Sequence, residues 1–237
     1  MNKVLGSEML DEVVDEMVQI YGGYGFIEDY PAARAYRDAR INRLYEGTNE
    51  INRLVIAGQV LRRASTGRIP LLDAARRAAA ALDAAPDDGP APLPALGTSE
   101  ERLARAKTGV LACLGRVIDR AVNLDECQEV LGWLSDLMIE VFAVESGVLR
   151  ARQGAGTPRG GLMMEIARDA VAELGPSLER LAARILSAIE EDPLLSRDLA
   201  GMRALLGGGP PNTLAARRAI ADQVLEAGGY GLGLPPA

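Results

Sequence analysis

Histidine is absent from this 237-residue sequence. Its absence removes the most common general base at neutral pH, the most common zinc ligand and every nucleophilic triad that depends on an imidazole. Any acid–base chemistry must therefore come from a carboxylate, a lysine, a tyrosine or a bound cofactor. We predict no metal site.

Cysteine and long apolar runs are also scarce. Cys113 and Cys127 are the only cysteines, and because both lie in segments with a helical pattern we expect buried small side chains, without a disulfide framework. No stretch approaches the roughly 18–20 continuous apolar residues that span a bilayer, and residues 1–20 carry charges where a signal peptide is apolar. These features predict a soluble, cytoplasmic protein.

The balance of charge and the shortage of aromatics narrow the class further. The formal net charge is -7, which does not attract nucleic acid, so we expect no nucleic-acid partner. Aromatic residues make up only 4 % of the chain, and its apolar content is rich in the strong helix formers Ala and Leu. Apolar residues recur at helical spacing and no strand pattern is present, which predicts an all-α fold.

The helical patterns fall into two groups, separated by a segment that contains the helix-breaking run PDDGPAPLP. We predict a first helical unit at residues 1–64, a linker at 65–97 whose mobile part is 84–97, and a second helical domain at 98–237. Thr48 and Thr98 are expected to cap helices, the latter in a capping box with Glu101.

Aromatic side chains are concentrated around a Gly-Gly turn. Six of the nine aromatic residues fall within residues 21–45: Tyr21, Tyr24, Phe26, Tyr30, Tyr36 and Tyr45. They form either a packed site for a planar ligand or a local aromatic core under the turn, and composition leaves both interpretations open.

Glu46, Gly47 and Thr48 stand at a predicted junction between a loop and a helix. A carboxylate is followed there by a residue without a side chain and then by a capping hydroxyl. Glu46 either faces a ligand that approaches the Gly47 backbone, or is a helix-start carboxylate favoured by the helix dipole.

Residues 1–64 resemble the C-terminal domain of acyl-CoA dehydrogenases in nearly unbroken register, through KVLGSEMLDEVVDEM, QIYGGYGF and YPAARAYRDARINRLYEGTNEINRL. The later segment QEVLGWLSDLMIEVFAVESGVLRAR resembles the extra C-terminal helical domain of the very-long-chain type and its bacterial relatives. The family's N-terminal helical domain and β-domain have no counterpart in this sequence.

The resemblance implies FAD-dependent α,β-dehydrogenation of acyl-CoA thioesters in fatty acid β-oxidation, with electron-transferring flavoprotein as the acceptor. Glu46 corresponds to the general base that removes the α-proton, and Gly47 to the residue beside the substrate. The missing domains supply much of the acyl pocket in the family, so we expect the chain alone to be inactive.

The resemblance also implies which residues contact the cofactor. Thr48 and Glu50 correspond to positions that contact FAD, while Gln19, Gly22 and Gly23 correspond to a loop that reaches the flavin of a neighbouring subunit. We therefore expect a homodimer, or a partner chain that carries the missing domains. The alternative is a non-catalytic helical interaction or dimerisation module, or a degenerate gene remnant.

A basic stretch follows the first unit. It either lies against an anionic membrane or the phosphates of CoA, or forms a solvated face, and the second interpretation is favoured because large apolar anchors are lacking. Its members are Arg62, Arg63, Arg68, Arg76 and Arg77.

Overall fold

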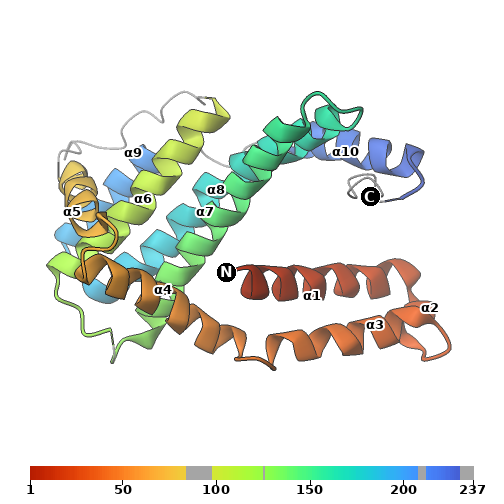
Figure 1. The fold of residues 1–237 in the computed structure, drawn as a ribbon, viewed down its shortest axis with the longest axis horizontal. Helices are drawn as coiled ribbons and strands as arrows, with labels where there is room; N and C mark the ends of the chain where they lie inside the picture. Colours follow the sequence, from red (N-terminus) through yellow and green to blue (C-terminus); the bar gives the residue numbers. More distant parts are fainter. Residues whose placement is uncertain (84–97, 125, 208–211, 230–237) are drawn as a thin grey trace.

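The computed structural model describes residues 1–83, 98–124, 126–207 and 212–229, drawn in colour in Figure 1. These residues form ten α-helices and one 3-10 helix and contain no strand, which confirms the predicted all-α fold. The helices are α1 (Asn2–Tyr21), α2 (Gly23–Phe26), α3 (Pro31–Arg40), α4 (Asn49–Ser65), α5 (Leu71–Leu82), α6 (Ser99–Asp119), α7 (Gln128–Gly154), α8 (Gly160–Ile189), α9 (Leu194–Leu206) and α10 (Leu214–Glu226), with the 3-10 helix η1 at Ile41–Arg43.

The first three helices form a hairpin in which α1 and α3 lie side by side (Figure 1). Gly22 ends α1 in the left-handed region, at φ 58°, where glycine is favoured. A Cβ on Gly25 would lie 2.5 Å from the Val18 carbonyl oxygen, so only glycine lets α2 pack against α1 at this point.

Both predicted N-caps are present. The hydroxyl of Thr48 accepts a hydrogen bond from the Ile51 N–H at 3.3 Å at the start of α4. Thr98 and Glu101 form the full capping box at the start of α6. These local signals fix where the two helices begin.

The main hydrophobic core lies among α5 to α9, with Ala57 of α4 at its edge. Leu114, Leu134, Leu178 and Ile185 are among its fully buried members. In contrast, the hairpin of α1 and α3 buries few side chains, and all of them are small: Val4, Ser7, Val14, Ala32 and Ala39. The long helices therefore form the stable body on which α4 is docked and to which α1–α3 are attached.

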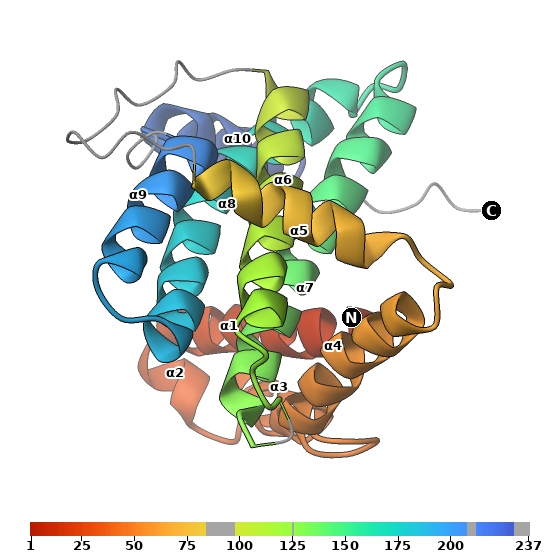
Figure 2. The ribbon, with the colours of Figure 1, turned by 90° about the vertical axis from the view of Figure 1, so that its left-hand side faces the viewer.

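The helix α5 corrects part of the predicted linker at 65–97. Ala75, Ala78 and Leu82 give this segment an apolar face, which packs on α6 as α5 crosses it (Figure 2). Gly115 of α6 permits the close approach, because a Cβ there would collide with the Ala75 carbonyl oxygen. The narrower prediction of a mobile segment at 84–97 lies outside the described residues.

The two cysteines are free thiols, as the sequence predicts. Cys113 is buried, and burial raises the pKa of its thiol to about 12, whereas Cys127 is half-buried against the core; neither forms a disulfide. Within the described ranges, no helix combines the length and the apolar character needed to cross a bilayer. All five side chains of the basic stretch are exposed.

Candidate active site

Glu46 lies in the short loop between η1 and α4, with an unusual backbone conformation. Its φ is 54° and that of Gly47 is 83°, so two consecutive residues adopt the left-handed region. For a residue with a Cβ this conformation costs roughly 1–2 kcal/mol. The Glu46 side chain is exposed.

Two side chains hold this loop through the same carbonyl oxygen. The Gly47 oxygen accepts hydrogen bonds from Lys3 Nζ at 2.9 Å and from Asn52 Nδ2 at 2.7 Å. Asn52 Nδ2 also donates to the Thr48 oxygen at 3.0 Å. The loop is thus tied to the first turns of both α1 and α4.

Asn49, only 2 % exposed, lies behind the loop and connects it to α1. Its Nδ2 donates to Ser7 Oγ at 2.9 Å and to Glu8 Oε1 at 3.0 Å, while its Oδ1 accepts from Lys3 Nζ at 2.7 Å. Burial of a polar amide is tolerated here because both ends of the amide are paired.

A charged group continues this network into the second helical group. Arg53 donates from Nη1 and Nη2 to Glu8 at 2.7 and 2.8 Å, and from Nε to Asp136 of α7 at 2.6 Å. Burial tends to raise the pKa of Glu8, but the hydrogen bonds from Arg53 and Asn49 outweigh it and hold that pKa below its usual value. Glu8 is therefore an ionised partner of Arg53 at neutral pH.

Glu50 occupies the exposed first turn of α4, close to Thr48. Hydrogen bonds to the Glu50 carboxylate lower its pKa, with the larger effect from the Glu50 backbone N–H and the smaller from the Thr48 hydroxyl. The structure thus brings together four predicted site residues, Glu46, Gly47, Thr48 and Glu50, on one loop and the helix turn that follows it.

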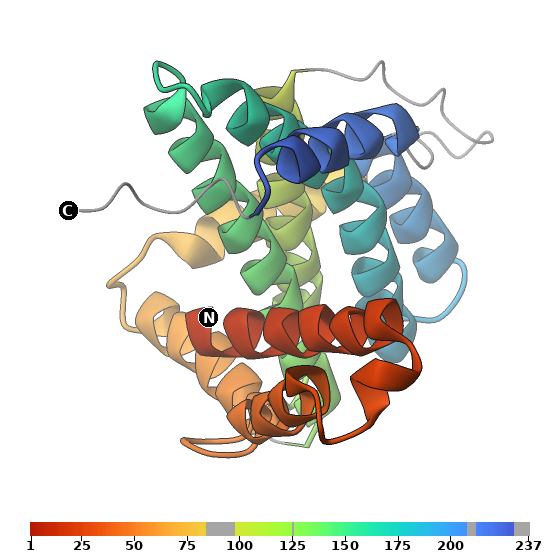
Figure 3. The same cartoon turned by 90° about the vertical axis from the view of Figure 1, so that its right-hand side faces the viewer.

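The other three predicted residues lie at the C-terminal end of α1 and in the turn into α2, and this end of α1 is opposite the one that contacts the Glu46 loop (Figures 1 and 3). Gln19, Gly22 and Gly23 are all exposed there. Nothing in the described structure lies within 4 Å of a Cβ built on either glycine, so the turn is open to an approaching group. Because a helix of 20 residues is about 30 Å long, the two sets cannot contact the same part of one ligand within this chain.

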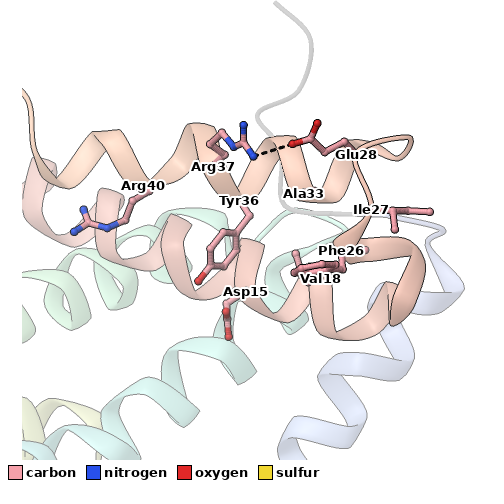
Figure 4. A pocket seen from close by; sticks show the side chains of 10 residues that line it. Asp15, Val18, Phe26, Ile27, Glu28, Ala33, Tyr36, Arg37 and Arg40 are labelled. Carbon is pink, nitrogen blue, oxygen red and sulfur yellow. Dashed lines mark hydrogen bonds and ion pairs between the residues drawn. The ribbon is translucent and has the colours of Figure 1, made fainter.

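An open hollow of about 880 Å³ lies between α1, α2 and α3 (Figure 4). Val18, Phe26, Ile27, Ala33 and Tyr36 provide much of its apolar lining. Charged groups also line it, and one of them, Arg37, donates to Glu28 at 2.8 Å, as the dashed line in Figure 4 marks. None of the seven predicted site residues lines this hollow.

The local aromatic core that was one interpretation of residues 21–45 is wrong. All six aromatic side chains are at least 40 % exposed, and the one ring pair among the described residues is the edge-to-face contact of Tyr24 and Tyr30, at 5.1 Å between centroids. Only Phe26 and Tyr36 of the six line the hollow.

Sequence reasoning missed the residues that support the loop, namely Lys3, Asn49, Asn52, Arg53 and Asp136. Lys3 is separated from Gly47 by 44 positions and Asp136 from Arg53 by 83, so no local pattern connects them. Asn52 lies on the first turns of a predicted helix and could have been recognised as a short polar side chain able to bond backward to the loop.

Comparison with known proteins agrees with this architecture. Residues 1–61 and residues 106–203 each match a family model described as acyl-CoA dehydrogenase, C-terminal domain. A probable acyl-CoA dehydrogenase of Bacillus subtilis is 36 % identical over 97 % of this chain and 39 % of that protein. The human mitochondrial short-chain specific acyl-CoA dehydrogenase is 52 % identical over 62 residues, which are 26 % of this chain and 15 % of that protein.

A solved structure gives the same assignment. The crystal structure of an acyl-CoA dehydrogenase complexed with FAD from Bacillus anthracis superposes with a TM-score of 0.84 at 36 % identity, over 95 % of this chain and 39 % of that one. The chain thus spans about two-fifths of the length of these two bacterial relatives. With its two C-terminal domain matches and its all-helical fold, the chain belongs to the acyl-CoA dehydrogenase family.

Proposed function

We propose that the chain is the C-terminal helical portion of an enzyme that carries out FAD-dependent α,β-dehydrogenation of acyl-CoA thioesters in fatty acid β-oxidation. The observation that carries this proposal is the Glu46 loop: an exposed carboxylate on a left-handed backbone that Lys3 and Asn52 hold in place. The backbone that carries this carboxylate is thus held in place, while the carboxylate itself is open to a ligand.

Glu46 is the proposed general base. An isolated glutamate, with a pKa of about 4.3, is a weak base for an α-proton. Its basicity rises when a bound thioester and the covering protein exclude water from the carboxylate. Gly47, which has no side chain, leaves room for the thioester beside the loop.

The cofactor positions are assigned in two sets. In this proposal Thr48 and Glu50 contact a flavin near Glu46, whereas Gln19, Gly22 and Gly23 serve a flavin held mainly by another subunit. The open space over both glycines fits such an approach, and so does their separation from Glu46 along α1. FAD, when bound, accepts the hydride that leaves the β-carbon.

The proposed partner is a second copy of the chain or a polypeptide that carries the missing domains. Among the described residues, fifteen of the nineteen large exposed apolar side chains lie within residues 9–55. An apolar surface of this size is usually covered by another protein surface in water. We propose that the partner named above covers it. We further propose a cytoplasmic location and electron-transferring flavoprotein as the electron acceptor.

The competing proposal is a non-catalytic interaction or dimerisation module, including a degenerate gene remnant. The same exposed apolar surface favours it, because that surface suffices for association without any turnover. It requires no role for the Glu46 carboxylate, and this difference separates the two proposals.

Dye-coupled oxidation of acyl-CoAs of several chain lengths tests the function. We expect no turnover from the chain alone, even with FAD, and turnover after mixing with a polypeptide that carries the N-terminal and β-domains. In that assembly Glu46→Gln should lower α-proton exchange by about 10²–10⁴-fold while acyl-CoA binding persists. Glu12→Gln, on the exposed surface of α1, is the matched control.

Three outcomes decide between the proposals. Full activity of Glu46→Gln would refute the assignment of Glu46 as the base. Robust activity of the isolated chain would refute the proposal that turnover requires the N-terminal and β-domains. Association of the mixed chains without turnover at any chain length would favour the interaction module.

The flavin assignment has its own test. Gly23→Val should weaken flavin retention by the assembly, because it places a branched side chain in the open approach. Unchanged flavin retention would identify the glycines as turn residues alone.

A further inference from the structure

We infer that Lys3 is a positioning residue, whose ammonium group holds the Gly47–Thr48 peptide and so helps to keep the Glu46–Gly47 turn in the conformation that presents the Glu46 carboxylate. This inference rests on the proposed function of Glu46. It assigns a role to the first turn of α1, 43 positions before the base in the sequence.

The ammonium group bridges two acceptors, one in the loop and one in the first turn of α4. Lys3 Nζ donates to the Gly47 oxygen at 2.9 Å and to Asn49 Oδ1 at 2.7 Å. Charged donors make stronger hydrogen bonds than neutral ones, so the Lys3 ammonium adds substantially to the restraint that the neutral amide of Asn52 places on the same oxygen. The restrained carbonyl is that of Gly47, the residue after Glu46.

The direction of the ammonium group is itself determined. Asn49 is buried, and its Nδ2 is committed to Ser7 Oγ and Glu8 Oε1 at 2.9 and 3.0 Å. Only the Oδ1 end of the amide can therefore face Lys3. A buried amide with one possible orientation thus aims an otherwise flexible lysine at the loop.

The restraint matters because the loop is unfavourable by itself. Glu46 has a Cβ and a φ of 54°, a conformation that persists only where the surroundings impose it. Without the Lys3 contact, Asn52 alone holds the Gly47 oxygen, so the backbone at Glu46 and Gly47 is freer to change its conformation and to redirect the Glu46 side chain. A displacement of about 1 Å at a reacting group costs roughly 100-fold in rate.

The chain offers a matched control, since Lys3 and Lys107 are its only lysines. Lys107 pairs with Glu145 between α6 and α7, away from the loop. Lys3→Met and Lys107→Met remove the same charge and retain the same apolar stem. Lys3→Arg keeps a charged donor at the site and serves as the rescue variant.

The first arm measures hydrogen exchange of the full chain without substrate or cofactor. The Ile51 and Asn52 amides, which bond to Thr48 at 3.3 and 2.9 Å, report on the end of the loop. We expect Lys3→Met to speed their exchange about tenfold at an unchanged melting temperature, and Lys107→Met and Lys3→Arg to match the parent chain. Equal exchange in all four proteins would overturn the inference.

The second arm uses the assembled enzyme and separates kcat from KM. Lys3→Met should lower kcat by roughly 10–100-fold with KM nearly unchanged, and Lys3→Arg should restore most of it. Faster exchange with an unaltered kcat would overturn the positioning role. If Lys3→Met fails to fold, Lys3→Gln, which stays polar beside Asn49 but is shorter than lysine, takes its place with the same expectations. If the assembly binds acyl-CoA but shows no turnover even with the parent chain, that result would count against the proposed function. The hydrogen-exchange arm would still decide whether Lys3 holds the loop.

Discussion

Arg53 of α4 donates from Nε to the carboxylate of Asp136 in α7 at 2.6 Å. One residue before Asp136, the hydroxyl of Ser135 donates to the Arg53 carbonyl oxygen and accepts from the Ala57 N–H at 3.1 Å. A single turn of α7 thus engages both the side chain and the backbone of α4. The helix that follows the Glu46 loop is therefore braced by the second helical group.

Asp136→Ala tests how much this contact stabilises the chain. Arg53 and Asp136 are mostly buried, and the substitution leaves Arg53 with Glu8 as its remaining carboxylate partner. We expect the free energy of unfolding to fall by about 1–3 kcal/mol, as for hydrogen bonds to charged groups. Urea unfolding measures it. The control is Asp73→Ala, because Asp73 forms an exposed ion pair with Arg76, with 3.9 Å between Oδ1 and Nη1. This substitution should change stability by less than about 0.5 kcal/mol. Equal effects in the two variants would contradict the brace.

Gly115→Ala tests the close crossing of α5 and α6. A Cβ at this position would collide with the Ala75 carbonyl oxygen and would lie 2.7 Å from Ala79 Cβ, so the two helices would have to separate. We expect a loss of about 1–3 kcal/mol in unfolding experiments, as for other overpacked cores. Gly132→Ala in α7 meets nothing within 4 Å and should be neutral or stabilising through its helix propensity. A stabilising Gly115→Ala would show that α5 is not packed against α6.

The pH dependence of stability should change in Glu190→Gln. Burial raises the pKa of Glu190 despite its hydrogen bonds from Arg120, and its Oε2 has no hydrogen-bond partner within the described part of the chain. The folded chain then holds the proton more tightly than the unfolded chain does. The contribution of Glu190 to stability is therefore present below the ordinary glutamate pKa and is lost as pH rises through the folded-state pKa.

Glu190→Gln removes this titration, so it should flatten the decline in stability above about pH 4.5. Urea unfolding across pH 4.5–8 is the measurement, with the exposed neighbour in Glu191→Gln as the control. If the free energy of unfolding declines equally with pH in Glu190→Gln and in the parent chain, the decline comes from titratable groups other than Glu190.

The division into units at 1–64 and 98–237 stays a prediction, and limited proteolysis tests it. The run APDDGP at residues 85–90 is polar and rich in breakers, so first cleavage is expected between about residues 84 and 97. Primary cleavage within residues 128–150, which lie inside α7, would contradict the division.

Sequence patterns predicted the helical class and the features that depend on neighbouring residues. Thr48 and Thr98 cap their helices as expected, because a cap involves residues only three positions apart. The α5 segment lies within the predicted linker at 65–97, although its Ala-rich composition favours a helix. Its packing on Gly115 is a contact across the fold that local sequence does not signal.

The family resemblance points to Glu46 as the base, an assignment that stays a prediction, but nothing in the sequence pointed to the residues that support its loop. The left-handed φ of Glu46 has no signature in the sequence apart from the glycine that follows it. Lys3 reaches Gly47 only because α1 passes beside the start of α4. Supports of this kind depend on tertiary geometry and become visible only in the folded chain.

The length of α1 has a consequence for the evolution and redesign of this chain. The helix carries Lys3 beside the Glu46 loop at one end and the turn at residues 19–22 at the other, so its length sets the distance between the two sets of proposed site residues (Figure 3). Inserting one residue would shift one end by about 1.5 Å and turn it by about 100° relative to the other. Substitutions within α1 leave the distance between its ends unchanged, whereas insertions and deletions within it alter the spacing and orientation of both ends at once.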